Sequence, residues 1–279
     1  MSDEDKSKDL LSQISLNRLR RVVIGEPRNL ADKTVFHSVS LVPFLAWVGL
    51  GADPLSSSCY GPQEVFKALG EHTYLAVLLT LAIIGTVTII ATAYSCIIEE
   101  FPHGGGGYNV ATKLLGPRWG VVSGCALLVD YILTITVSIA AAGDAIFSLL
   151  PEHLQQFKIA LEIFLIVFLI VINLRGVRES VIVLMPVFVL FLVTHLVLIL
   201  GMLARHGGEL PLVAQQVTGG FRHGISTLGV WGLILLFLRA FSAGGGTYTG
   251  LEAVSNGLPM IREPRVLFAK RTMLYMATS

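Results

Sequence analysis

The sequence has few charged residues, and this shortage narrows the class of protein. Charged residues make up 14% of the 279 residues, whereas a soluble globular domain carries about 25%. The charges cluster in short islands, and the stretch from Tyr74 to Ile98 carries none. About 20 apolar residues are enough to cross the hydrocarbon core of a bilayer, and such runs are too continuous for the alternating strands of a membrane barrel. The sequence therefore predicts an all-α integral membrane protein.

Other features are also missing, and each absence removes a class of function. Three cysteines in apolar segments predict no disulfide framework, and residues 1–37 lack the apolar core of a cleavable signal peptide. The glycines at 104–107 are not followed by the Gly-Lys-Ser/Thr of a phosphate-binding loop, and the histidines are too scattered to predict a metal cluster. A net charge of +1 gives no reason to expect nucleic acid as a partner. Without a nucleophile–base pair, we expect neither an enzyme nor a cofactor.

The apolar runs predict six membrane spans and the start of a seventh, at 38–70, 73–98, 119–149, 158–174, 180–204, 225–257 and 272–279. Because the chain stops within the last of these, we expect a truncated product. Fifteen of the 20 Lys and Arg residues fall in the N-terminal tail and in the loops on its side of the membrane, and four fall on the other side. Positive charge favours the cytoplasmic side. We therefore expect a multi-pass plasma-membrane protein with residues 1–37 as a cytoplasmic tail.

Two of these spans carry helix-breaking residues at membrane depth. The first has glycines, prolines, serines and an aspartate around 51–62, and the sixth has Gly-Gly-Gly-Thr-Tyr-Thr-Gly at 244–250. Proline removes a helical N–H, and unwound backbone is tolerated in a bilayer only where it is buried in protein or lines a cavity. Two interrupted spans in corresponding positions indicate a transporter site. They correspond if 38–204 forms a five-helix repeat and 225–279 begins a second one. A pair of kinks without function is the alternative.

Further motifs occur in a recognisable order, and their residues read FPHGGGGY at 101–108, NLRGVRES at 173–180, LEAVSNGLP at 251–259 and REPR at 262–265. Together with the interrupted spans, they resemble the amino acid–polyamine–organocation (APC) superfamily of permeases over nearly the whole chain after residue 38. The resemblance implies a five-plus-five inverted-repeat (LeuT-like) transporter fold, truncated here after the sixth or seventh helix. It also implies a substrate held between spans one, three, six and eight.

Carboxylates within the spans favour a cation as the substrate. Asp53 lies in the first interruption, Asp130 lies in span three, and Glu252 follows the second interruption. Ionisable residues in a membrane mark a pathway by default. Asp130 shares one helical face with Thr134 and Ser138, because the three are spaced four residues apart. Side-chain oxygens of this kind suit a hard ion.

The spacing of these residues resembles the ion sites of the KimA-type potassium importers within the superfamily. This likeness implies that potassium and a proton are the transported partners. It also implies that Glu252 carries the coupled proton, with potassium ligands at Asp53, Tyr60, Asp130, Thr134, Ser138, Thr249 and Glu252. We therefore expect proton-coupled potassium uptake by alternating access, with an amino-acid or polyamine permease as the alternative. A homodimer is compatible with either function.

Several of these residues have a structural interpretation as well. Asp130 could form an ion pair with Arg239 and hold two spans together, and Thr134 and Ser138 are residue types that commonly pack between helices. Tyr60 could be an interfacial aromatic. Tyr248 is bulky for a loop of small residues, and it could narrow the ion pocket.

Overall fold

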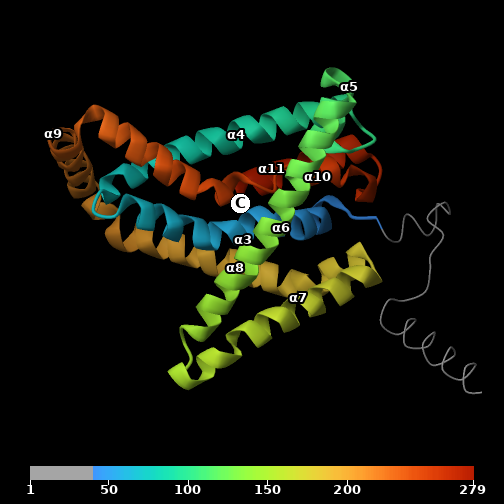
Figure 1. The fold of residues 1–279 in the computed structure, drawn as a ribbon, viewed down its shortest axis with the longest axis horizontal. Helices are drawn as coiled ribbons and strands as arrows, with labels where there is room; N and C mark the ends of the chain where they lie inside the picture. Colours follow the sequence, from blue (N-terminus) through green and yellow to red (C-terminus); the bar gives the residue numbers. More distant parts are fainter. Residues whose placement is uncertain (1–39) are drawn as a thin grey trace, which may run out of the picture.

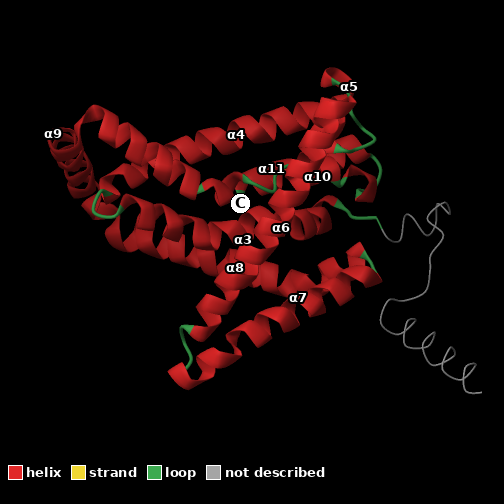
Figure 2. Ribbon diagram, viewed as in Figure 1, coloured by secondary structure: helices red, strands yellow, loops and turns green. Residues whose placement is uncertain are grey.

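The computed structural model describes residues 40–279, so the expected cytoplasmic tail at 1–37 lies outside the described residues. Helices make up almost all of this region, and no β-strand forms among residues 40–279. The longer helices are α3 (Pro43–Leu69), α4 (Ala76–Glu100), α6 (Pro117–Phe147), α7 (Lys158–Arg175), α8 (Val177–His206), α9 (Leu210–Ala243) and α11 (Arg265–Thr278). Shorter ones are α5 (Gly106–Leu115), α10 (Ala253–Asn256) and the 3₁₀ turns η1 (Thr73–Leu75), η2 (Glu152–Phe157), η3 (Gly207–Glu209), η4 (Gly245–Tyr248) and η5 (Leu258–Met260). The loops between them are short (Figure 2). The all-α prediction is confirmed.

Helix α3 lies at the centre of the molecule. It packs against α8, α9 and α11, while α6 crosses the bundle at a steep inclination (Figure 1). One core cluster joins α3, α8 and α11 around Val48, Phe188 and Met273, and a second joins α3 to η1 and α9 around Leu69 and Leu233. The first polar segment expected from the sequence, 51–62, lies within this central helix, and the second, at 244–250, packs against it.

Four stretches of the described chain are long and apolar enough to cross a membrane: Thr73–Glu100, Pro117–Phe147, Glu152–Arg175 and Val177–Ala243. The last one contains both α8 and α9. Helix α3, expected as the first span, is not among these stretches, because its prolines, serines and Asp53 lower its hydropathy. Most of the large side chains on α6, α7 and α8 are apolar and exposed, as expected where lipid takes the place of water.

The last helix differs from the expected start of a span at residue 272. Helix α11 begins at Arg265, one residue after Pro264. Lys270 forms an ion pair with Glu99 at the end of α4, and Thr272 is fully buried and donates to the Phe268 carbonyl at 2.9 Å. Lys270 and Arg271 therefore lie inside the helix and do not mark its start.

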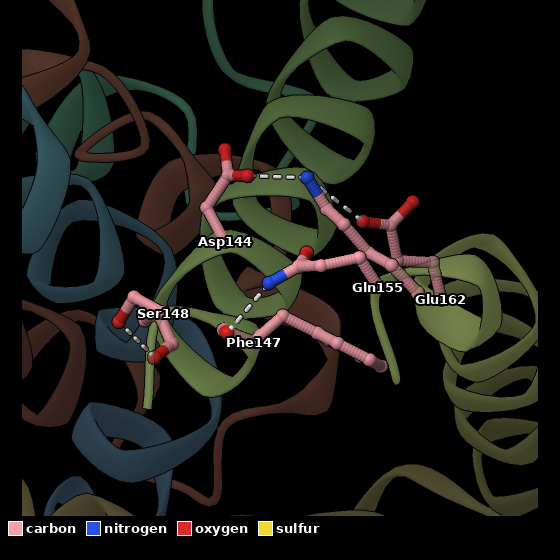
Figure 3. Close-up of polar contacts among 7 residues, drawn as sticks. Asp144, Phe147, Ser148, Gln155 and Glu162 are labelled. Atoms are coloured by element: carbon pink, nitrogen blue, oxygen red, sulfur yellow. Dashed lines mark hydrogen bonds and ion pairs between the residues drawn. The ribbon is translucent and has the colours of Figure 1, made fainter. Parts of the chain in front are cut away.

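Helices α6 and α7 are joined at one end by a polar cluster (Figure 3). Lys158, the first residue of α7, forms an ion pair with Asp144 of α6, and its Nζ lies 3.9 Å from Glu162 Oε1. Gln155 Nε2 donates to the Phe147 carbonyl at 2.8 Å. The cluster ties the end of α6 to the start of α7, which packs against it.

Candidate ion-binding site

The polar stretch of α3 stays helical, so the interruption expected in this span is not present. The helix continues through Pro54 and Pro62. Ser56 and Ser57 donate from their Oγ atoms to the Asp53 carbonyl, at 2.8 and 3.2 Å. Serine hydroxyls can donate in this way to a carbonyl of the preceding turn. Their hydrogen bonds therefore stay within the helix and do not disrupt it. Each proline removes one N–H and crowds the preceding turn, and the helix nevertheless continues where α8, α9 and α11 pack around it.

The second glycine-rich segment leaves the helical conformation. Helix α9 ends at Ala243, η4 follows, and Thr249 is extended with φ −79° and ψ 163°. Gly250 has φ 87°, a left-handed conformation that glycine enters without steric cost. The short helix α10 then begins directly after Glu252. Three consecutive glycines at 244–246 give this stretch little helix propensity, which favours its unwinding.

Glycines let the two polar segments approach each other closely. A Cβ atom on Gly250 would lie 2.8 Å from both Asp53 Oδ2 and Pro54 Cδ. A Cβ on Gly246 would lie 3.4 Å from the Tyr60 hydroxyl, and one on Gly61 would overlap Thr247. The backbone at 244–250 is therefore seated against the polar face of α3.

Three carboxylates from different elements lie within electrostatic reach of one another. Asp53 is on α3, Asp130 is on α6, and Glu252 immediately precedes α10. Asp130 and Glu252 line the same cavity, and Asp53 Oδ2 lies against Gly250, two residues before Glu252. Like charges repel strongly where water is largely excluded. This arrangement is stable with a bound cation or with a proton on one of the carboxyls.

The expected structural role of Asp130 as a partner of Arg239 is not found. No ion pair joins these two residues in the described part of the chain, and Arg239 is exposed on α9. The Oε1 atom of Glu252 is buried and has no hydrogen-bond partner among the described residues. Both carboxylates are thus left with capacity for a cation.

The other expected ligands have distinct surroundings. The Tyr60 hydroxyl lies 2.9 Å from the Oγ of the fully buried Ser57, so it faces the interior and not a membrane interface. Thr249 Oγ1 donates to the Gly246 carbonyl at 3.0 Å. Thr134 is half-buried on α6, and the buried Ser138 Oγ has no hydrogen-bond partner within residues 40–279. Ser138 and Glu252 therefore both present unpaired oxygens.

The seven expected ligands do not surround one space. Asp130 and Glu252 line a cavity of about 270 Å³, together with Tyr94, Tyr108, Ser123 and Asn256. Tyr60 and Ser138 line a larger cavity of about 830 Å³ between α3, α6 and α8. Asp53, Thr134 and Thr249 line neither cavity, and Asp53 instead contacts the second interruption. Four of the expected ligands thus divide between two cavities, and Asp53 links α3 to the second interruption through its close approach to Gly250.

Sequence reasoning missed Asn256, which connects the site to two other elements. Its Nδ2 donates to the Tyr131 hydroxyl on α6 at 2.9 Å, and its Oδ1 is buried without a hydrogen-bond partner among the described residues. Gly106 approaches so closely that a Cβ there would overlap this Oδ1. Sequence position could have indicated Asn256, because it lies one helical turn after Glu252, and its partner Tyr131 directly follows Asp130.

Tyr248 does not narrow either cavity. Its ring stacks on Phe241 of α9, with centroids 5.4 Å apart and an interplanar angle of 25°. Its hydroxyl donates to the Phe241 carbonyl at 3.4 Å. The Tyr248 side chain folds back along α9 and therefore does not occupy either cavity.

The chain is similar to known membrane transport proteins. The amino acid permease family model matches residues 55–278. The chain is also 35% identical over 263 residues to the potassium transporter KimA of Bacillus subtilis (strain 168), in an alignment that covers 92% of this chain. It spans 42% of the length of that relative.

Proposed function

Because the chain belongs to the amino acid permease family of the APC superfamily, we propose that its protein is a secondary transporter that takes up potassium together with protons. The family has the LeuT-like fold, and the protein is a multi-pass membrane protein. In this proposal, residues 38–204 form the first repeat, residues 225–279 begin the second, and residues 1–37 lie in the cytoplasm. Transport then proceeds by alternating access around the interruption at 244–250.

One observation carries the proposal: Asp130 and Glu252 line the same cavity inside an apolar bundle, with Asp53 against Gly250 beside them, and no ion pair with Arg239 neutralises them among the described residues. An amino acid bound at this cluster would bring its own carboxylate into a field of like charge. A bare cation would instead satisfy the unpaired oxygens, because oxygen ligands replace the hydration shell of a hard ion. The relative that transports potassium supports the same substrate.

Glu252 suits the proton-coupling role by its position. It lies between the interruption at 244–250 and α10, and its Oε1 lacks a hydrogen-bond partner among the described residues. Removal from water favours the neutral form of a carboxyl group, whereas a bound cation favours the charged form. A proton and a potassium ion can therefore alternate at this carboxyl, which couples their movements.

The first test is potassium uptake by the complete protein, in cells that lack their own uptake systems and grow at limiting potassium. We expect rescue by the unchanged protein and by Glu71→Gln, which alters an exposed acid outside the site. Asp53→Asn and Glu252→Gln should each weaken apparent potassium affinity or uptake by at least about tenfold, equivalent to about 1.4 kcal/mol. Glu252→Gln should also abolish the proton flux that accompanies uptake.

Two results would contradict the proposal. Unchanged uptake in Asp53→Asn and Glu252→Gln would remove the carboxylate cluster from the ion path. Failure of a well-expressed, correctly inserted protein to rescue growth would favour an organic cation or an amino acid as substrate, which uptake of labelled spermidine or arginine by the same cells would reveal.

A further inference from the structure

The first part of α9, residues 210–228, is a strongly amphipathic helix. Its apolar residues recur every three or four positions and so share one face: Leu210, Val213, Ala214, Val217, Phe221, Ile225 and Leu228. The opposite face carries the polar ones: Gln215, Gln216, Arg222, His223 and Ser226. Leu212 is the exception, since it lies on the polar side. A helix with so many polar groups on one face is unsuited to cross a bilayer.

One edge of the apolar face is docked on the protein. Gly220 and Gly224 form a groove for the ring of Tyr74, because a Cβ on Gly220 would lie 2.5 Å from Tyr74 Cδ1. Phe221 packs edge-on against the same ring, with centroids 6.3 Å apart. The Tyr74 hydroxyl is held by His72 Nδ1 at 3.0 Å. These contacts fix the rotation of the helix about its axis.

The rest of the apolar face is uncovered. Exposure is 61% for Leu210, 42% for Val213, 43% for Ile225 and 43% for Leu228. A contiguous exposed apolar face marks an interaction surface. The position of the segment in the chain identifies its surroundings, because it directly connects two membrane spans. Only the three residues of η3 separate His206, the last residue of α8, from the start of α9.

A kink at Gly229 ends the segment on its C-terminal side. Gly229 has non-helical angles, φ 69° and ψ 171°, which separate residues 210–228 from the part of α9 that returns to the site. In Figure 1 the first part of α9 turns across the ends of α3, α4 and α8 and does not continue alongside them. With a membrane span attached at either end, the segment is held at the membrane surface.

We propose that residues 210–228 form an interfacial helix whose apolar face is immersed in the phospholipid bilayer beside the turn at 70–75. Val213, Ile225 and Leu228 reach the boundary between headgroups and acyl chains, and Gln216, Arg222 and His223 face the headgroups and water. The segment contains one arginine and no acid, so it approaches anionic headgroups without repulsion. The helix supports the kink at Gly229, from which the interrupted span leads to Gly244–Gly250.

The test measures the depth of single residues in proteoliposomes of phosphatidylethanolamine and phosphatidylglycerol. Cys59, Cys96 and Cys125 are replaced by serine, and a nitroxide label is placed on Val213→Cys or Ile225→Cys, with Gln216→Cys and His223→Cys as matched controls on the opposite face. Ile89→Cys on α4, whose native side chain is 71% exposed, is the lipid reference. Relaxation by oxygen and by a water-soluble nickel complex then reports depth.

We expect labels at 213 and 225 to lie roughly 5–10 Å below the headgroups, and labels at 216 and 223 to remain accessible to nickel. Equal nickel access on both faces would overturn the proposal, and so would protection of 213 and 225 from both reagents, because protein would then cover the face. If serine replacement prevents folding, the native chain is crosslinked to a phospholipid carrying a diazirine near its headgroup. Labelling must then fall on the apolar face of 210–228, and its absence there would also overturn the proposal.

Discussion

Gly250 occupies the point where the second interruption meets α3. Its φ of 87° lies in a region that costs other residues about 1–2 kcal/mol. The same residue has no room for a side chain, because Asp53 Oδ2 and Pro54 Cδ would each lie 2.8 Å from an added Cβ. Backbone conformation and close approach both require glycine here, and both requirements come from the position of a site carboxylate.

Replacement of Gly250 with alanine should therefore displace Asp53 and weaken cation binding. We expect a loss of stability of about 1–3 kcal/mol from overpacking, together with at least about a tenfold loss of potassium affinity. Gly85→Ala on α4 is the matched control, since nothing lies within 4 Å of its added Cβ. Thermal unfolding in detergent and rubidium binding measure the two effects. A Gly250→Ala protein with unchanged affinity would show that Asp53 does not bind the ion.

Unpaired oxygens form a second pattern at this scale. Glu252 Oε1, Asn256 Oδ1 and Ser138 Oγ are all buried and have no hydrogen-bond partner among residues 40–279. A buried polar atom without a partner costs about 1–3 kcal/mol, so such atoms are normally rare. These three atoms belong to residues that line the two cavities, and a desolvated cation would satisfy them.

Helices α3 and α9 show how far local sequence predicts an interruption. Both contain glycine, serine or threonine at membrane depth, and the sequence predicts a break in both. Only the run at Gly244–Gly246 unwinds. Helix propensity alone does not separate the two segments, because a proline disfavours a helix more than a glycine does. The continuity of α3 depends on packing against α8, α9 and α11, which residue patterns do not contain.

The interfacial segment of α9 offers a matched pair of neighbouring glycines. Gly219→Ala should stabilise the helix by up to about 1 kcal/mol, because alanine favours helices and nothing lies within 4 Å of its Cβ. Gly220→Ala should instead destabilise the protein by about 1–3 kcal/mol, since the new Cβ would lie 2.5 Å from Tyr74 Cδ1. Thermal unfolding of both variants in the same detergent measures the difference. Equal effects of the two substitutions would mean that Tyr74 does not dock this helix.

At the scale of the whole molecule, residue types in the site were predictable but their grouping was not. The three carboxylates could be found from the sequence because ionisable residues within apolar spans stand out. The division between a cavity at Asp130 and Glu252 and another at Tyr60 and Ser138 depends on the crossing of α6 over α3. Asn256 was not predicted, because an uncharged amide one turn after a carboxylate is only a weak indication of a site in the sequence.

A cation bound between these elements should stabilise the whole fold. The carboxylates come from α3, α6 and the segment before α10, so one ion opposes their mutual repulsion and ties the elements together. A ligand that binds the folded state at 100 times its dissociation constant stabilises it by about 2.7 kcal/mol. Saturating potassium should thus raise the thermal unfolding temperature of the purified protein, compared with N-methylglucamine at equal ionic strength.

The variants then decide whether this stabilisation arises at the site. In Asp130→Asn the potassium effect should largely disappear, while the repulsion lost with the charge should stabilise the protein in N-methylglucamine. Glu152→Gln, which changes an exposed acid in the loop after α6, should keep the full effect. Identical potassium effects in all three proteins would mean that the ion acts through general screening of charge. Stabilisation by spermidine and not by potassium would instead identify the carboxylate cluster as a site for an organic cation.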